Sequence, residues 1–308
     1  MSRLFDRIKE GVSWPPFVGQ DVKDGVYRLV VEQAIPSIEV GNVADYYFGE
    51  WDKYSLARKD YLPNWPNLAP PFSDWFCSYR LTPSMSRQVN VGLPDYWIDG
   101  LGVLFQAHEN TPDEAKPWRW TCISILFHDV RGIPLALGAV TYRVMPDGSG
   151  WRSDEADRMC FVDPVINWTM QSEDIAEHVQ SLEWTIWHAL YPSLLAISFM
   201  HCKNVNLIPN EADEKLQRAR EKRGKKPLAR YYTLEIEPMK EVLRREGNIE
   251  KTGLKQALHI CRGHFKDYRE RGLFGRNKGL YWWDQQVRGS LSEGVVVKDY
   301  AVKQPKQG

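Results

Sequence analysis

The sequence predicts an α+β protein: an antiparallel β meander in the first half, helices in the middle, and a basic helix plus β-hairpin module at the C-terminus. Three observations indicate this class. Strand-like runs with turn-sized connectors lie between residues 102 and 144, apolar residues recur at helical spacing after residue 172, and a strand-loop-strand pattern lies between residues 257 and 289. Strands followed by helices and further strands are typical of α+β proteins. A chain of 308 residues suffices for one or two domains.

The first half consists of predicted strands and Pro-rich connections. Residues 26–32 and 75–80 are rich in β-branched and aromatic residues, and each run predicts a short strand. Four prolines make residues 56–75 an extended connection between them. The meander that follows has three predicted strands: residues 102–109, 119–128 and 134–144. Because residues 129–133 form a connector of turn length, the last two strands are expected to pair antiparallel.

The middle of the chain predicts helices. Ser172 can cap a helix whose first turn contains acids that complement the helix dipole. Its apolar residues recur at helical spacing: Ile175, Val179, Leu182, Ile186 and Leu190. Pro192 kinks or restarts this helix, which is expected to extend to about Cys202. A second helix is expected over residues 211–223, capped by Asn210 and ended by Gly224.

The last third combines a strand, a helix and a hairpin. Residues 230–237 predict a strand and residues 239–246 a helix, and a last strand is expected over residues 294–302. Between the last two elements, residues 257–268 and 280–289 predict the two strands of a hairpin. We therefore expect a mainly β part over residues 1–171 and a helical part with the hairpin module over residues 172–308. Because no obvious linker separates these parts, one continuous domain is the alternative.

Cysteine usage and the known motifs exclude several classes of function. The five cysteines are an odd number without a C-x-x-C pair, which favours reduced thiols in a cytoplasmic setting. The segments around His201 and His259 match no established zinc spacing, so no metal site is expected. No phosphate-binding loop, dinucleotide fingerprint or nucleophile elbow is present, so we expect no cofactor. The N-terminus lacks a secretory signal, and the longest apolar stretch, residues 189–200, is too short to span a membrane.

Charge is unevenly distributed along the chain. Residues 201–308 contain 24 Lys and Arg against 14 Asp and Glu, whereas the whole chain is neutral. Within residues 215–230, eight cations accompany one carboxylate, a pattern typical of a phosphate-binding surface. The candidate nucleic-acid-binding residues are Lys215, Arg218, Lys222, Lys225, Lys226 and, from the hairpin, Arg288. The alternative is an ordinary solvated helix end, because acids first and bases last complement the helix dipole.

The predicted hairpin concentrates groups that can perform chemistry. In a regular strand Arg262 and His264 share one face, and Arg288 arrives from the partner strand. His264 is therefore the candidate general acid or base, and Arg262 the candidate group that stabilises developing charge, which would suit metal-independent RNA cleavage. The same residues could hold a phosphate without chemistry, or His264 could form a hydrogen bond across the sheet. Trp282 and Trp283 face opposite sides, so one can enter the core while the other shelters a surface.

The C-terminal third resembles a group of uncharacterised phage- and prophage-encoded proteins. The residues that carry the resemblance are Arg262-Gly-His-Phe265, Leu273-Phe-Gly275 and Val287-Arg-Gly289, together with Cys202-Lys-Asn-Val205 and the basic run. The resemblance implies a mobile-element origin and a bacterial cytoplasm, but no reaction. We therefore expect a phage-type accessory protein that binds nucleic acid, with possible nuclease activity. The alternatives are an interaction module for an acidic host protein, or a component of particle assembly.

Overall fold

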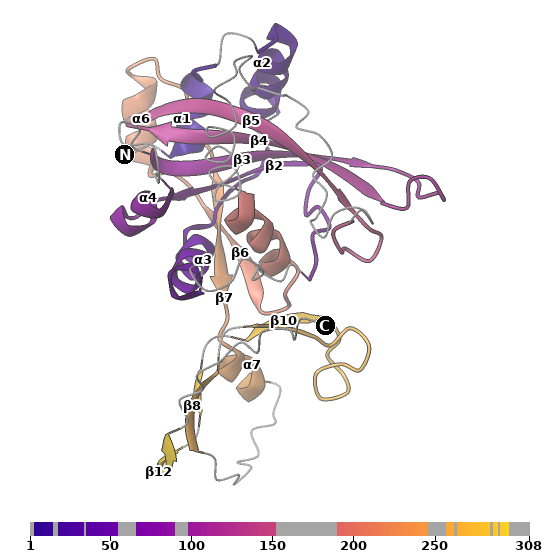
Figure 1. Ribbon diagram of the computed structural model, residues 1–308. Coiled ribbons are helices and arrows are strands. Elements are labelled where there is room, and N and C mark those ends of the chain that lie inside the picture. Colours follow the sequence, from indigo (N-terminus) through magenta and orange to yellow (C-terminus); the bar gives the residue numbers. More distant parts are fainter. Residues whose placement is uncertain are drawn as a thin grey trace, which may run out of the picture. The chain divides into compact units, whose positions relative to one another are not determined.

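The protein consists of two compact units in the computed structural model shown in Figure 1. Unit 1 comprises Met1–His201 and Leu207–Glu235, and unit 2 comprises Cys202–Asn206 and Ile236–Gly308. The structure describes residues 3–14, 18–33, 35–54, 66–89, 98–151, 190–245, 257–261, 264–283, 286–288 and 290–295. The expected boundary after residue 171 falls outside these residues and stays a prediction.

Unit 1 is built on a mixed sheet of seven strands in the order β5-β4-β3-β2-β1-β7-β6. The strands are β1 Ser37–Glu39, β2 Asp74–Arg80, β3 Ile98–Glu109, β4 Trp120–Val130, β5 Ile133–Val144, β6 Val205–Asn210 and β7 Tyr231–Ile236. Strands β2 to β5 pair antiparallel, whereas β1 lies parallel to both β2 and β7. The predicted meander is therefore confirmed, as are the strands predicted at residues 75–80 and 230–237. Strands β1 and β6 were not predicted.

The turn between β4 and β5 explains why the sequence predicted that these two strands pair antiparallel. Val130 and Ile133 pair directly, so Arg131 and Gly132 alone form the turn. Both have positive φ, 50° and 85°, which is the backbone conformation of a tight hairpin. Asp129 holds the turn, because its Oδ1 accepts a hydrogen bond of 3.0 Å from the N–H of Gly132.

One face of the sheet packs against α1 (Leu4–Glu10), α2 (Gln20–Tyr27) and the π-helix η1 (Arg28–Glu32). The ring centroids of Phe5 in α1 and Phe76 in β2 are 5.1 Å apart. The strand predicted over residues 26–32 is wrong. Val26, Leu29 and Val30 are all buried in this core cluster, and their i, i+3, i+4 spacing is that of a helix.

The other face of the sheet packs against α3 (Gly41–Tyr54), which lies on the far side of the strands from α1. Residues alternate between faces along β2, so Trp75 and Tyr79 point away from Phe76. Trp75 is fully buried and stacks on Phe105 with ring centroids 4.6 Å apart. Helix α4 (Pro83–Val89) follows β2, and its Ser86 hydroxyl donates to the carbonyl of Ile98.

A further helix of unit 1 covers residues 190–200 and continues through Pro192. This confirms the prediction that a helix extends to about Cys202, and the start predicted at Ser172 lies outside the described residues. The phenol ring of Tyr191 contacts Tyr47 of α3, with ring centroids 6.0 Å apart.

Unit 2 contains α7 (Met239–Arg245) and two small sheets. The strands are β8 Ala257–Cys261, β9 His264–Asp267, β10 Leu280–Trp283, β11 Gln286–Arg288 and β12 Ser290–Val295. Strand β9 pairs antiparallel with β10, and β8 pairs antiparallel with β11, in two separate sheets instead of the single two-stranded hairpin that the sequence predicts. The last strand, β12, begins earlier than predicted and lies parallel to β8. Helix α7 agrees with the helix predicted at residues 239–246.

Two features hold unit 2 together. A hydrophobic cluster joins α7 to the hairpin through Met239, Val242, Leu273, Tyr281 and Trp283. The fully buried side chain of Asn204 donates hydrogen bonds to the carbonyls of Glu237 and Trp282, and it accepts one from the N–H of Trp282. A single amide therefore ties three segments of unit 2 that are distant in sequence.

Candidate nucleic-acid interface

The basic run forms helix α6 (Glu214–Glu221) and a loop, residues 222–230, that we call the basic loop. Helix α6 begins three residues later than predicted. Asp213 caps it, because its Oδ1 accepts hydrogen bonds from the N–H groups of Lys215 and Leu216 at 2.8 and 3.2 Å. The predicted cap, Asn210, is instead the last residue of β6, and its amide donates to the hydroxyl of Thr233 in β7.

The end of α6 is closed by a glycine turn, as the sequence predicted. Gly224 has a φ of 65°, in the left-handed region that glycine favours. The N–H of Gly224 donates to the carbonyl of Glu221, and the N–H of Lys225 donates to the carbonyl of Arg220. These two bonds form a Schellman motif, which satisfies the last carbonyl groups of the helix without a side chain.

Gln217 fixes the basic loop against its own helix. The side-chain amide of Gln217 donates to the carbonyl of Leu228 and accepts from the N–H of Leu228, both at 2.9 Å. Both polar ends of one side chain therefore contact one residue of the loop. The contact spans 11 positions in sequence and restricts the path of the chain between α6 and β7.

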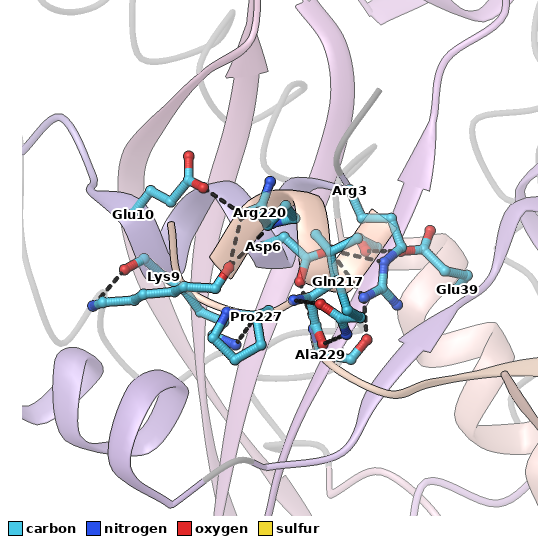
Figure 2. Close-up of polar contacts among 12 residues, drawn as sticks. Arg3, Asp6, Lys9, Glu10, Glu39, Gln217, Arg220, Pro227 and Ala229 are labelled. Atoms are coloured by element: carbon cyan, nitrogen blue, oxygen red, sulfur yellow. Dashed lines mark hydrogen bonds and ion pairs between the residues drawn. The ribbon is translucent and has the colours of Figure 1, made fainter. Parts of the chain in front are cut away.

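Helix α1 holds the other side of the basic loop, as Figure 2 shows. The buried carboxylate of Asp6 accepts a hydrogen bond of 2.8 Å from the N–H of Ala229. Arg3 pairs with Asp6 and also donates to the carbonyl of Ala229. The loop is thereby bound to α1 through both backbone groups of Ala229.

Three cations of this region point inward and bind backbone. Lys226 donates to the carbonyl of Lys9, and Lys9 donates to the carbonyl of Pro227, each at 2.9 Å. The Arg220 side chain, 13% exposed, donates to the carbonyl of Lys226 and pairs with Glu10 at 2.5 Å. Lys226 was predicted to contact phosphate directly. The structure uses it to hold the loop, because its ammonium is half-buried against α1.

Cations and carboxylates are interleaved here, with Arg3 paired to Asp6 and Arg220 paired to Glu10. Burial lowers the pKa of Lys9, and the nearby charges of Lys226, Arg3 and Arg220 lower it further, while Asp6 acts in the opposite direction. Four cations, Arg3, Lys9, Arg220 and Lys226, therefore lie where α1 meets the basic loop, against the two carboxylates of Asp6 and Glu10.

The remaining cations of the run are exposed. Among the described residues, the side chains of Lys215, Lys222, Arg223 and Lys225 have no ion-pair partner, and all four are exposed. Arg218 is exposed too, but it pairs with Glu214 at 3.1 Å. The charge that is not neutralised locally therefore lies mainly at the C-terminal end of α6 and in the basic loop.

A groove of about 440 Å³ lies between the N-terminal half of α6 and the end of the basic loop, where Leu228 and Arg230 line it. Its lining includes Arg218 and Arg230, and each of these arginines lies near a carboxylate, Glu214 and Glu211 respectively. Because its two arginines are already paired, the groove is a weaker site for phosphate than the unpaired cations Lys222, Arg223 and Lys225.

The second part of the predicted site, the hairpin, belongs to unit 2. His264 is exposed at the start of β9, directly opposite Trp283 of β10. The ammonium of Lys266 lies 4.1 Å from the Trp283 ring centroid. Arg262 lies outside the described residues, and of Arg288 only the backbone in β11 is described. The pairing of His264 with Arg262 therefore stays a prediction.

Tryptophan burial favours packing over an open stacking surface. Trp282 and Trp283 are both buried, at 3% and 9% exposure, the former against Phe265 and the latter in the cluster with α7. The sequence predicted that one of the two would shelter a surface, whereas both are buried, and Lys266 lies over the ring of Trp283. No tryptophan whose burial the structure describes is exposed.

The remaining site predictions concern thiols, metals and membranes. Cys77, Cys122 and Cys202 are buried free thiols, and burial raises the pKa of Cys122 to about 12, so this thiol is unreactive. Within the described residues, no cluster of His, Cys, Asp or Glu could hold a metal ion. No helix in that part of the chain is both long enough and apolar enough to cross a membrane.

Sequence reasoning missed the contribution of α1 and α2 to this region. Arg3, Asp6 and Lys9 lie more than 200 positions from the basic loop, and no local pattern links them to it. The alternation of Arg3, Asp6 and Lys9 along one helical face was the available signal, and it could not identify a partner. No protein-family model matches the chain, and no curated protein or solved structure shows significant similarity to it.

Proposed function

We propose that this protein binds nucleic acid through the exposed cations at the end of α6 and in the basic loop, as an accessory protein of phage type. One observation carries the proposal. Arg220 and Lys226 are directed inward and hold the loop, whereas Lys222, Arg223 and Lys225 remain exposed without carboxylate partners among the described residues. A fixed group of adjacent cations is suited to phosphate contacts, because little side-chain and loop order is lost on binding.

An ordinary solvated helix end explains this arrangement less well. The Schellman motif already satisfies the last carbonyl groups of α6, so the helix dipole does not require three further cations. In addition, Lys9 and Lys226 bring two more positive charges to the same region. Repulsion between these positive charges raises the free energy of the unbound protein, and binding of an anionic partner would lower that free energy.

The proposal is limited to binding. Hydrolysis would require His264 and Arg262 to act together, and Arg262 lies outside the described residues. The variant His264→Ala serves as the separate test of cleavage: loss of an RNA or DNA product with retained folding would add nuclease activity to the proposal.

The test of binding is a charge reversal with a matched control. The triple change Lys222→Glu, Arg223→Glu and Lys225→Glu should weaken binding of a labelled oligonucleotide by about tenfold or more at moderate salt. It should also reduce the slope of log K against log salt by about 2, because about 0.7 counterions are released for each contact with a single strand. Fluorescence anisotropy over a range of salt concentrations measures both quantities.

The control makes the same charge change elsewhere in unit 1, at the exposed residues Arg87, Lys116 and Arg131. Affinity and salt slope should change much less in this variant, because net charge alone then differs. Equal losses in the two triple variants, or no loss in either, would contradict the proposal. Oligonucleotide-independent capture of an acidic host protein would favour the alternative of an interaction module.

A further inference from the structure

A half-exposed tyrosine lies beside the basic loop. Tyr27 is the last residue of α2, and its side chain is 50% exposed, the largest exposure of any aromatic residue in the described part of the chain. The ammonium of Lys226 lies 4.9 Å from the centroid of its ring. The aromatic ring and the cations of the loop are therefore parts of one surface within unit 1.

The backbone holds this ring at the surface. Val26 and Leu29, on either side of Tyr27, are 3% and 6% exposed in the core cluster that also contains α1. The chain continues directly from α2 into η1, where the N–H of Gln33 donates to the carbonyl of Arg28. Tyr27 therefore projects from a packed helical segment, and its ring loses little conformational freedom when a ligand binds.

The cation beside the ring is fixed as well. Lys226 donates to the carbonyl of Lys9, so its position over Tyr27 is set by α1. Lys225 is the adjacent residue in the chain and is exposed, as is Arg28, which follows Tyr27. An exposed planar ring with Arg28 next to it in sequence and the cations of the basic loop next to it in space is the combination that binds an unpaired base together with its flanking phosphates.

This combination discriminates between nucleic acids. The faces of bases within a duplex are already stacked on their neighbours, so a surface ring cannot reach them, whereas every base of a single strand presents an open face. The phosphate contacts of the basic loop serve both forms alike. Tyr27 would therefore add affinity for single strands alone.

We propose that this surface binds single-stranded nucleic acid, with one base stacked on Tyr27 and the flanking phosphates held by Lys225 and its neighbours in the basic loop. The proposal rests on the proposed function and specifies its ligand class. Tyr27 is a binding residue in this proposal, and Lys226 is a positioning residue that holds the loop and polarises the ring.

The test compares Tyr27→Leu with the conservative variant Tyr27→Phe on three labelled probes. The probes are a mixed-sequence single strand in DNA and RNA form, the duplex with its complement, and a strand of equal length with abasic sites. Tyr27→Leu should bind the single strand about tenfold more weakly, and the duplex and abasic strand within about twofold of the unsubstituted protein. Tyr27→Phe retains the aromatic face and should bind all probes like the unsubstituted protein.

Each other result has a distinct meaning. Equal weakening on every probe, or unchanged binding of the single strand by Tyr27→Leu, would overturn the stacking role and leave the proposed function intact. Failure of the charge-reversed triple variant to weaken any probe would overturn the proposed function itself. Thermal melting of both Tyr27 variants establishes that the fold is retained, since the half-exposed ring contributes little to the core.

Discussion

At the scale of single residues, the fold assigns different roles to side chains that look equivalent in sequence. Lys225 and Lys226 are adjacent and both follow a helix rich in bases. Lys226 points toward α1 and donates to the carbonyl of Lys9, whereas Lys225 remains exposed. The direction of each side chain depends on where α1 lies, and no local pattern contains that information.

His128 provides a pH-dependent prediction at this scale. It is 1% exposed in β4, neither ring nitrogen has a hydrogen-bond partner among the described residues, and burial lowers its pKa from 6.5 to about 3. The folded protein thus keeps His128 neutral while the unfolded chain binds a proton below the usual pKa. Stability is therefore complete above about pH 6.5 and falls as the pH decreases toward 3, by about 2 kcal/mol between about pH 7 and about pH 5.

Replacement of this histidine should remove that loss. Its cross-strand neighbours are Leu101 and Leu135, so His128→Leu is compatible with the site and should flatten the pH dependence of the free energy of unfolding. Urea denaturation at several pH values measures the effect. His108→Gln in the neighbouring strand is the matched control, because His108 is exposed and should leave the dependence unchanged. An unaltered slope in His128→Leu would contradict the assignment.

At the scale of elements, the residue at which a helix begins depends on which nearby polar side chain is still available to cap it. Asn210 and Asp213 are both suitable helix caps by residue type. Because β6 pairs with β7 as far as Asn210, the amide of Asn210 is used in the sheet and Asp213 begins α6. The end of α6 was predictable, since Gly224 supplies the left-handed conformation that the Schellman motif requires.

Two glycine substitutions should have opposite effects on stability. Gly224→Ala should destabilise the end of α6 by about 1 kcal/mol, because an L residue is strained at a φ of 65° even though no atom lies within 4 Å of the added Cβ. Gly25→Ala, inside α2 and equally uncrowded, should stabilise the protein by about 0.5 to 1 kcal/mol through its helix preference.

Chemical denaturation of the two variants measures both changes in the free energy of unfolding. The pair serves as its own control, since each variant adds one methyl group to unoccupied space. Destabilisation of equal size in both variants would show that steric crowding, and not backbone conformation, governs these positions.

At the scale of the whole molecule, the division into units gives a prediction about cooperativity. The side chain of Asn204 forms three hydrogen bonds, all within unit 2. Asn204→Ala leaves the buried N–H and carbonyl of Trp282 without partners and should destabilise unit 2 by about 3 kcal/mol. Hydrogen exchange should accelerate at Trp282 and along β9 and β10, while the strands β3 to β5 of unit 1 retain their protection.

Asn206→Ala provides the control, because Asn206 is exposed in the same segment and should leave exchange unchanged. Uniform acceleration across both units in Asn204→Ala would show that they unfold together. That outcome would contradict the prediction that the amide of Asn204 stabilises unit 2 alone.

Local patterns of alternation, turn residues and a helix-ending glycine were enough to predict the α+β class, the meander and the end of α6. Burial of Val26, Leu29 and Val30 in the core selects a helix over the predicted strand, and long-range contacts place Tyr27 and α1 beside the basic loop. The physical reason is that the residues in contact are far apart in the sequence. Contacts such as Asp6 with Ala229 join segments 223 positions apart, and their free energy depends on burial that no short stretch of sequence encodes.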